Sequence, residues 1–208
     1  MTNVVIASAA RTAVGSFGGS FANTPAHDLG AAVLEALVER AGIDKADVSE
    51  TIMGQVLTAG QGQNPARQAH INAGLPIESA AWGLNQVCGS GLRAVALGAQ
   101  HIQLGDASIV CAGGQENMTL SPHVAHLRAG QKLGDRKTMN ALIRNGWWTA
   151  FKGNPRAKPG EKVQNKGQLG ATMRMKLRLG PQTKAKPAQK AGGFVVGGTP
   201  SPAKRAKV

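Results

Sequence analysis

The sequence predicts an α/β fold with a mainly parallel sheet covered by helices, and three observations lead to this prediction. Short apolar runs alternate with longer amphipathic segments along the first part of the chain. Glycine, proline and acidic residues stand at the boundaries between these segments. Strands that alternate with helices are joined by crossover connections, and these place the strands in parallel.

The first two predicted elements are a strand and a helix. The apolar run Val4–Ala7 predicts a short, fully buried strand, which a Gly- and Ser-rich loop follows. Asp28 then precedes an amphipathic pattern that predicts a helix ending near Gly42. The apolar face of this helix is expected to consist of Ala32, Val33, Ala36 and Leu37.

The pattern continues in the same way as far as residue 112. The predicted elements, in chain order, are a strand at 50–58, a helix at 64–73, an extended segment at 80–87, a helix at 91–104 and a strand at 107–112. A further short helix is expected at 140–150, where it would carry two tryptophans.

The two parts of the chain differ sharply in charge. Residues 1–117 carry five Lys and Arg against nine Asp and Glu, whereas residues 118–208 carry nineteen Lys and Arg against two acids. From Lys152 onward Gly, Pro, Lys, Arg and Gln dominate. Such a composition buries too little apolar surface to offset its ordering entropy, so we expect a poorly ordered basic tail.

Composition also argues against several classes of protein. The two cysteines form neither a disulfide framework nor a CxxC pair, and free thiols favour a reducing cytoplasm. The apolar segments are too short for a membrane span, and the N-terminus lacks the basic region of a secretory signal. No metal-ligand spacing is present among the five histidines, which are His27, His70, His101, His123 and His126. We therefore expect a soluble, cytoplasmic protein without a metal, and we expect His70 to be a partly buried polar residue.

The most informative segment is 85–94, which reads NQVCGSGLRA. Cys88 stands where an extended segment meets a predicted helix, between small neighbours that include Gly89 and Gly91. A helix N-terminus stabilises a thiolate, and small neighbours let a substrate carbonyl approach the sulfur. Backbone N–H groups at such a turn can hold an oxyanion, as covalent acyl transfer requires.

A second interpretation of this cysteine stays open at the level of the motif alone. A single cysteine ahead of a helix is more often a small buried hydrophobic residue than a nucleophile. The other cysteine, Cys111, lies in the apolar run 109–112 and is expected to be such a core residue.

At these residues the chain resembles the thiolase family, specifically its biosynthetic acetyl-CoA acetyltransferases. The block at 85–94 is similar to the family's nucleophile motif. Three further blocks resemble family segments in the same order, namely SAARTAVGSFGGS at 8–20, GQVLTAGQGQNPARQAHINAGLP at 54–76 and CAGGQENMTLSPHVAHLRAGQKLGD at 111–135.

The resemblance implies a fold and a reaction. It implies the N-terminal half of a thiolase fold, in which Cys88 takes an acetyl group from acetyl-CoA and passes it to a second acetyl-CoA. The product is acetoacetyl-CoA, and the reverse reaction is thiolysis. The Cys88 N–H is implied as an oxyanion donor, acetyl-CoA or another acyl-CoA as the partner, and a homo-tetramer as the assembly. No metal or organic cofactor is implied.

The resemblance also implies a division of the chain. Residues 1–118 correspond to the N-terminal α/β domain and residues 119–151 to the start of a loop or lid domain. Residues 152–208 form a divergent basic segment. Family members are longer, and their second half supplies a histidine, an asparagine and another cysteine that complete the site.

Three hypotheses remain open from the sequence. The chain is a truncated thiolase that is active in its complete form, or a catalytically inactive thiolase-like fragment. The third is a basic, nucleic-acid-interacting protein built on half of a thiolase scaffold. The tail has no Tyr and therefore few base-stacking platforms, so we do not expect nucleic acid to be the partner.

Overall fold

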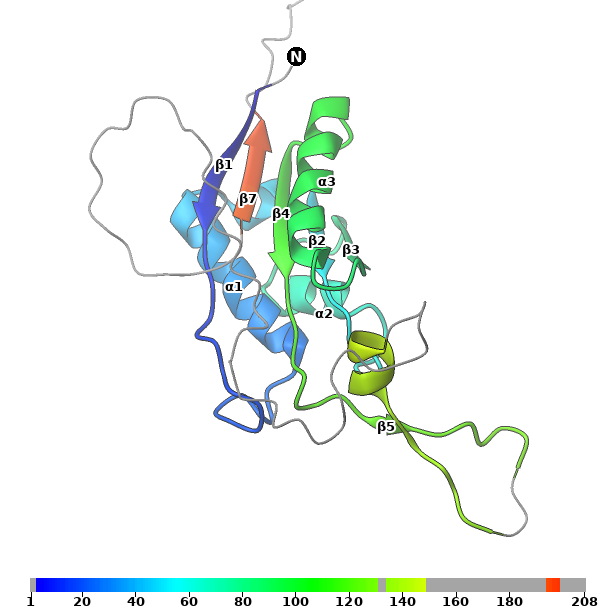
Figure 1. The fold of residues 1–208 in the computed structure, drawn as a ribbon. Coiled ribbons are helices and arrows are strands. Elements are labelled where there is room, and N and C mark those ends of the chain that lie inside the picture. Colours follow the sequence, from blue (N-terminus) through cyan, green and yellow to red (C-terminus); the bar gives the residue numbers. More distant parts are fainter. Residues whose placement is uncertain (1–2, 131–133, 149–193, 199–208) are drawn as a thin grey trace, which may run out of the picture.

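The computed structural model describes residues 3–130, 134–148 and 194–198 of the chain, and Figure 1 shows their arrangement. A five-stranded sheet lies at the centre. Its strands, in spatial order, are β1 (Val4–Ala9), β7 (Phe194–Gly198), β4 (Ile109–Gly114), β2 (Glu50–Gly54) and β3 (Ala80–Leu84). Strand β2 pairs in parallel with both β3 and β4, whereas β7 is antiparallel to β1 and to β4.

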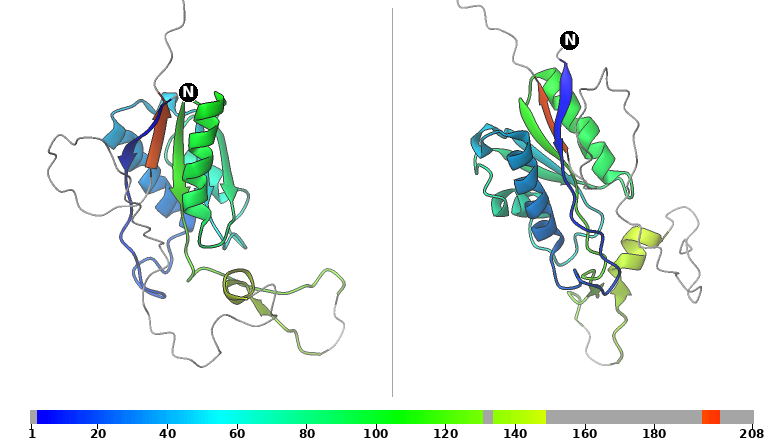
Figure 2. Two further views of the ribbon diagram at one scale, coloured as in Figure 1. Left: turned by 45° about the horizontal axis from the view of Figure 1, so that its top comes forward. Right: turned by 90° about the vertical axis from the view of Figure 1, so that its left-hand side faces the viewer.

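Three helices cover the two faces of this sheet. Helices α1 (Ala26–Ala41) and α2 (Pro65–Asn72) lie on one face, and α3 (Ser90–Leu104) lies on the other, as the right-hand view of Figure 2 shows. The predicted α/β fold with a mainly parallel sheet covered by helices is therefore confirmed.

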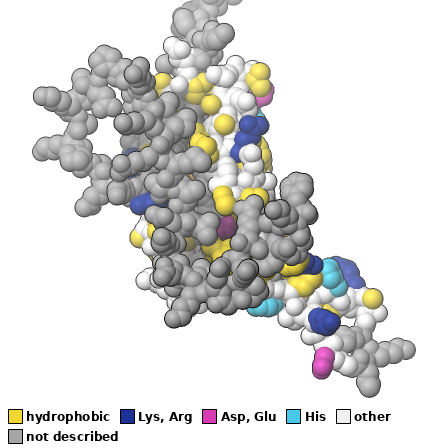
Figure 3. Space-filling view, viewed as in Figure 1, with side chains coloured by type: hydrophobic (Ala, Val, Ile, Leu, Met, Phe, Trp, Pro, Cys, Tyr) yellow, Lys and Arg dark blue, Asp and Glu magenta, His cyan; other side chains and the backbone are white. Residues whose placement is uncertain are grey.

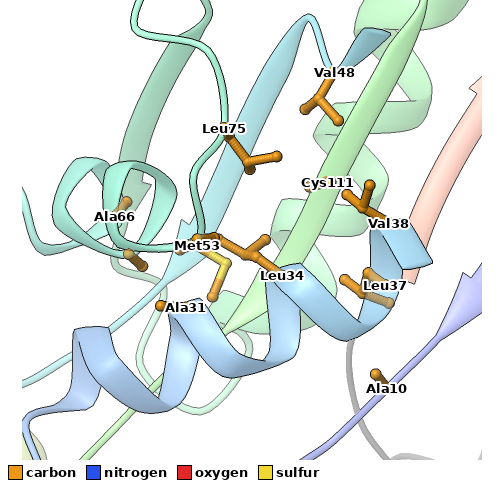
Figure 4. Packing of buried hydrophobic residues seen from close by; sticks show 12 residues of the cluster. Ala10, Ala31, Leu34, Leu37, Val38, Val48, Met53, Ala66, Leu75 and Cys111 are labelled. Carbon is orange, nitrogen blue, oxygen red and sulfur yellow. The ribbon is translucent and has the colours of Figure 1, made fainter. Parts of the chain in front are cut away.

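Strand alternation divides the core between these two faces. Met53 and Cys111 point toward α1 and α2, where they join the cluster drawn in Figure 4 with Leu34, Leu37, Val38 and Ala66. Ile52 and Val110, one position earlier on each strand, point the other way and pack against Ala94 and Ile102 of α3. Side chains two apart on a strand share a face, so β2 and β4 contribute to both layers.

Helix α1 ends where the sequence predicts, but its buried stripe is different. Gly42 adopts a left-handed conformation with φ of 64°, and its N–H bonds to the carbonyls at the end of the helix. The expected face of Ala32, Val33, Ala36 and Leu37 is wrong in part, because Ala32 is exposed and Leu37 alone of the four is fully buried. The stripe that faces the sheet consists of Ala26, Gly30, Ala31, Leu34, Leu37 and Val38.

Strand β1 is present where it is predicted, but the expectation of full burial is wrong. Val5 is 55% exposed and Ile6 is 42% exposed, whereas all five residues of β2 are buried. The difference follows from position, because β1 forms an edge of the sheet while β2 lies between two parallel neighbours.

The three parallel strands end at one edge of the sheet. Gly54, the last residue of β2, pairs with Leu84 of β3 and with Gly114 of β4. Strands β2 and β3 are shorter than the segments predicted for them, which are 50–58 and 80–87. Beyond Gly54 the chain leaves the sheet because the N–H groups of Val56 and Leu57 donate to the Glu116 carboxylate instead of to a neighbouring strand.

A small second unit follows the sheet. Strands β5 (His123–Val124) and β6 (Met139–Asn140) pair antiparallel. The helix expected at 140–150 is present in part: residues 141–142 are α-helical and continue into a π-helical turn (Ile143–Trp147). Residues 149 and 150 lie outside the described residues, as does most of the basic segment 152–208. The described part of that segment is β7, a strand that the sequence analysis did not predict. No described helix is long and apolar enough to cross a membrane.

Candidate functional site

Cys88 lies in the turn between β3 and α3 and is exposed to solvent. This turn stands at the edge where β2, β3 and β4 end, the lower end of the sheet in Figure 1. In open α/β sheets the crevice outside the carboxyl ends of the strands is the usual place for a ligand. The structure therefore puts the predicted nucleophile in a position where substrate can reach it.

The turn that carries Cys88 is fixed by hydrogen bonds on both sides. The Val87 carbonyl accepts from Ser90 Oγ at 2.6 Å and from the Ser90 N–H at 3.1 Å. The Ser90 Oγ accepts in turn from the Gln86 N–H at 2.9 Å, and Asn85 Oδ1 accepts from the Val87 N–H at 2.9 Å. These bonds hold Val87 at φ of 51°, a left-handed conformation that costs free energy for a β-branched residue.

Close backbone contacts seat the start of α3 on the sheet. A Cβ added to Gly54 would lie 2.6 Å from the Gly91 nitrogen and from the Ser90 Cβ. A Cβ added to Gly114 would lie 3.3 Å from the Gly91 Cα and from the Gly54 carbonyl oxygen. Glycine at positions 54 and 114 therefore lets the helix N-terminus lie directly against the ends of β2 and β4.

The start of α3 is suited to holding negative charge. Gly89 is the N-cap, and no side chain caps the helix there. The first N–H groups of a helix and its dipole favour an anion, and Cys88 immediately precedes this cap. The Gly89 and Ser90 N–H groups donate to the Gln86 and Val87 carbonyls, so an oxyanion at this position would be stabilised by the helix dipole and by N–H groups further along the first turn.

A network of amide side chains lies beside the ends of β2 and β4. Gln55 Nε2 donates to the Leu57 carbonyl at 3.1 Å and to Gln61 Oε1 at 2.7 Å, and Gln115 Nε2 donates to Gln55 Oε1 at 2.9 Å. Gln55 and Gln115 are both buried, so these bonds compensate for the loss of hydration. The Gln55 N–H also donates to the Leu84 carbonyl, which links this network to the strand that leads to Cys88.

Glu116 anchors the loop that follows β2. Its carboxylate accepts from the Val56 N–H at 2.8 Å and from the Leu57 N–H at 3.3 Å. Burial raises the pKa of Glu116 above its usual range, while its backbone hydrogen bonds act in the opposite direction. The loop and the end of β4 are thus joined through one partly buried carboxyl group.

Cys111 occupies the interior of β4, as the sequence predicts. Its side chain is fully buried in the cluster between the sheet and α1, and burial raises the pKa of its thiol to about 12. A thiol held neutral in this way does not supply a nucleophile or a base near neutral pH.

Two histidines have structural partners and do not lie with Cys88 in a described site. His70 is fully buried, which corrects the expectation of partial burial, and it bonds to Thr51 Oγ1 through Nδ1 and to the Pro76 carbonyl through Nε2. His101 Nδ1 lies 2.7 Å from Glu50 Oε2. Within the described residues no group of three or more His, Cys, Asp or Glu could hold a metal ion.

Two hollows lie near the carboxyl ends of the strands. One, of about 450 Å³, runs along β3 from Trp82 to Asn85 and is closed on its other side by the start of α2 at Asn64 and Pro65. The other, of about 280 Å³, lies between Ala59 of the loop after β2 and the β5–β6 unit, where Arg144 and His126 contribute to its lining. Asn85, which lines the hollow of about 450 Å³, precedes Cys88 by three residues in the sequence.

The sequence analysis identified Cys88 but missed the residues that fix its surroundings. Ser90, Gln55 and Glu116 were not singled out. Gln55 and Glu116 could have been selected from the sequence, because polar residues immediately beyond the ends of buried parallel strands converge at one edge of a sheet. No comparable signal marks Ser90, whose role depends on the path of the turn.

Comparison with known proteins gives a family match over most of the chain. The sequence model described as "Thiolase, N-terminal domain" matches residues 4–197. The match therefore reaches into β7 and covers most of the segment after residue 152, beyond the four blocks that carry the resemblance in sequence.

Individual relatives agree with this match. An acetyl-CoA acetyltransferase from Paracoccus denitrificans is 60% identical over 194 residues, which are 93% of this chain and 50% of that protein. A cytosolic acetyl-CoA acetyltransferase from Rattus norvegicus is 46% identical over 92% of this chain and 48% of its own length. The chain therefore spans about half the length of the curated relatives it matches.

A solved structure shares the fold. The Acat5 thiolase from Ascaris suum, determined in complex with coenzyme A, superposes with a TM-score of 0.70 and 37% sequence identity. The superposition covers 74% of this chain and 40% of that one.

Proposed function

The chain belongs to the thiolase family, and on that premise we propose that it provides the acyl-accepting half of an acetyl-CoA C-acetyltransferase with Cys88 as nucleophile. One observation carries the proposal. Cys88 is an exposed thiol at the N-terminus of α3, at the edge where the parallel strands end.

In the first step the Cys88 thiolate attacks the thioester carbonyl of acetyl-CoA. A bond forms between Sγ and the carbonyl carbon, negative charge develops on the carbonyl oxygen, and collapse of this intermediate releases the coenzyme A thiolate. The Cys88 N–H is proposed as one donor to the oxyanion, since it lies where the turn meets the helix. The product of this step is an acetyl thioester on Cys88.

In the second step a second acetyl-CoA accepts the acetyl group. Loss of a proton from its methyl carbon gives a carbanion that attacks the acetyl-Cys88 carbonyl, and Cys88 departs as a thiolate. The products are acetoacetyl-CoA and free enzyme, and the reverse sequence is thiolysis. The residue that activates Cys88 and the base for this second step are expected from the second half present in the longer relatives.

The remaining assignments are parts of the same proposal. Residues 1–118 form the thiolase N-terminal α/β domain, 119–151 begin the loop or lid domain, and 152–208 form the basic segment, which also adds β7 to the sheet. The complete protein acts as a homo-oligomer in the cytoplasm, and this reaction scheme requires no metal or organic cofactor. A reducing compartment suits the exposed Cys88 thiol.

The test is the intact mass of the chain after exposure to acetyl-CoA, beside Cys88→Ala and Cys111→Ala variants. Acetylation of the parent and of Cys111→Ala, but not of Cys88→Ala, is the expected result. Cys111 is a matched control because its thiol is buried and held neutral. A folded parent that gains no acetyl group contradicts the proposal for this chain alone and favours a thiolase-like fragment without catalysis.

A further inference from the structure

The peptide group between Val87 and Cys88 is oriented by a hydroxyl that takes no direct part in the proposed reaction. The Val87 carbonyl accepts two hydrogen bonds, one from Ser90 Oγ at 2.6 Å and one from the Ser90 N–H at 3.1 Å. A peptide group is planar and trans, so its C=O and N–H point in opposite directions. The Cys88 N–H is therefore directed away from the Ser90 hydroxyl.

The Cys88 N–H differs from its neighbours in the turn. The N–H groups of Val87, Gly89 and Ser90 all donate to groups within the turn. In the part of the chain that the structure describes, the Cys88 N–H has no hydrogen-bond partner. Cys88 is also exposed to solvent. A backbone donor that is free beside an exposed thiol can stabilise the negative charge that develops on an acyl oxygen.

This orientation of the peptide group depends on a backbone conformation that Val87 does not prefer. Val87 has a φ of 51°, and a β-branched residue is strained in this left-handed region. Such a conformation persists where the surrounding contacts hold it. Two side chains do so here, because Ser90 Oγ bonds to the Val87 carbonyl and Asn85 Oδ1 accepts from the Val87 N–H at 2.9 Å. If this hold is weakened, the backbone relaxes and the peptide group turns with it.

Ser90 can hold the peptide group because its own position is fixed. Only 4% of the residue is exposed, and its Oγ also accepts from the Gln86 N–H at 2.9 Å. A Cβ added to Gly54 would lie 2.6 Å from the Ser90 Cβ, so Ser90 packs closely against the end of β2. The hydroxyl therefore links the turn to the end of the sheet.

We propose that Ser90 is a positioning residue for acyl transfer, because its hydroxyl keeps the Cys88 N–H available to the oxyanion. The inference rests on the proposed function, in which that N–H is an oxyanion donor. Ser90 acts through the Val87–Cys88 peptide group and does not touch the acyl group. Loss of the hydroxyl therefore slows the reactions of Cys88 that form an oxyanion more than those that form none.

The test compares two reactions of the Cys88 thiolate. The ester p-nitrophenyl acetate acetylates it through an oxyanion, since Sγ bonds to the carbonyl carbon and p-nitrophenolate then leaves. Iodoacetamide alkylates it by displacing iodide from a saturated carbon, and no oxyanion forms. Both reactions need the thiolate, so the ratio of the acetylation rate to the alkylation rate removes differences in the amount of thiolate. A merely structural role of Ser90 would leave this ratio unchanged.

Ser90→Ala is expected to lower the ratio at least about fivefold, because the donor is no longer held in place. Ser49→Ala is the matched control. Ser49 Oγ donates to the Ile109 carbonyl at 2.8 Å and accepts from the Ile109 N–H at 3.1 Å, but it lies before the start of β2, whereas the Cys88 turn lies at the other end. The ratio in this variant should stay within about twofold of the parent.

Two further variants act on the same peptide group. Asn85 is exposed, so Asn85→Ala removes the second hold on Val87 without opening the core. It should lower the ratio at least about twofold. Glycine adopts a left-handed conformation without strain, so Val87→Gly in the Ser90→Ala background should restore part of the lost ratio.

Cys88→Ala gives the background for each reaction. Other nucleophiles are exposed around β5 and β6, among them His123, His126 and Lys137. Figure 3 shows Lys, Arg and His side chains in this unit, at the lower right. Histidine and lysine also attack activated esters, so their contribution must be subtracted.

An unchanged ratio in folded Ser90→Ala overturns the proposal, as does an equal fall in Ser49→Ala. If circular dichroism shows that Ser90→Ala does not fold, Asn85→Ala decides by the same criterion. The ester needs no coenzyme A site, so the result does not depend on whether acetyl-CoA acetylates this chain. Failure of the proposed function for this chain and failure of the role proposed for Ser90 are therefore separate outcomes.

Discussion

Ser90 Oγ donates a 2.6 Å hydrogen bond to the carbonyl oxygen of Val87, so the residues on either side of Cys88 are joined directly. The same oxygen accepts from the Gln86 N–H, and only 4% of Ser90 is exposed. Ser90 therefore helps to fix the backbone of the turn that carries Cys88.

Replacing Ser90 with alanine is expected to destabilise the protein by about 1–3 kcal/mol, because the Gln86 N–H and the Val87 carbonyl lose a buried partner. The alkylation rate of Cys88 is expected to change as well, since the turn relaxes. Chemical denaturation and mass-resolved alkylation measure the two effects. Ser20→Ala, at an exposed serine, is the control and should alter stability by less than about 0.5 kcal/mol.

Gly54→Ala is expected to displace the start of α3 from the sheet. The new Cβ would meet the Ser90 backbone carbon and the Gly91 nitrogen, and backbone atoms do not move aside as a flexible side chain does. We expect a loss of at least about 1–3 kcal/mol in unfolding free energy. Gly146→Ala has open space around the added Cβ, so a comparable loss in that variant would contradict the steric explanation.

His70 makes the stability depend on pH in the acidic range. The Pro76 carbonyl can only accept, so Nε2 carries the proton and Nδ1 accepts from the Thr51 hydroxyl. Burial lowers the pKa of His70 below its usual value of 6.5. The folded state therefore binds this proton less readily than the unfolded state, and the contribution of His70 is present above pH 6.5 and lost as pH falls through the folded-state pKa.

Urea denaturation at a series of pH values measures this dependence. The parent should lose stability between neutral and mildly acidic pH, and His70→Gln should show a shallower slope there. An identical slope in both proteins would assign the pH dependence to other groups.

Most helices and strands can be predicted from the sequence because the periodicity that marks each of them lies within one short stretch of chain. Strand and helix periodicity locate β2, α2 and α3, and the glycine after α1 marks its end. The apolar faces are less predictable, as Ala32 and Val5 show, because exposure depends on what lies opposite in space. Periodicity also gives no indication of β7, which pairs with strands far away in the sequence.

The candidate site also contains features that the sequence predicts and features that it does not. Cys88 is a candidate that its motif and its place before a helix suggest, whereas contacts such as that between Glu116 and the Val56 N–H join segments far apart in the sequence. Glu50 is an example from the opposite end of β2. It accepts from Trp82 Nε1 at 2.6 Å and pairs with His101, so three elements meet at one buried carboxylate that resembles a surface residue in the sequence.

Glu116→Gln tests how the partly buried carboxyl group after β4 affects stability. Burial raises the pKa of Glu116, so the folded state holds this proton more tightly than the unfolded state. The stabilisation from the protonated carboxyl group is complete below the unfolded-state pKa and is lost as pH rises through the folded-state pKa. Glutamine keeps an oxygen that accepts from the Val56 N–H and does not ionise.

The stability of Glu116→Gln relative to the parent should therefore increase from about pH 4 to pH 8, as the parent carboxyl group ionises. Paired denaturation curves at the two pH values measure the difference. Glu116→Ala, which removes the acceptor for Val56 and Leu57, should be less stable than Glu116→Gln at both pH values. A constant difference between parent and Glu116→Gln would mean that Glu116 titrates alike in the folded and unfolded states. In that case desolvation of the Glu116 carboxylate does not reduce the stability that its hydrogen bonds give to the loop after β2.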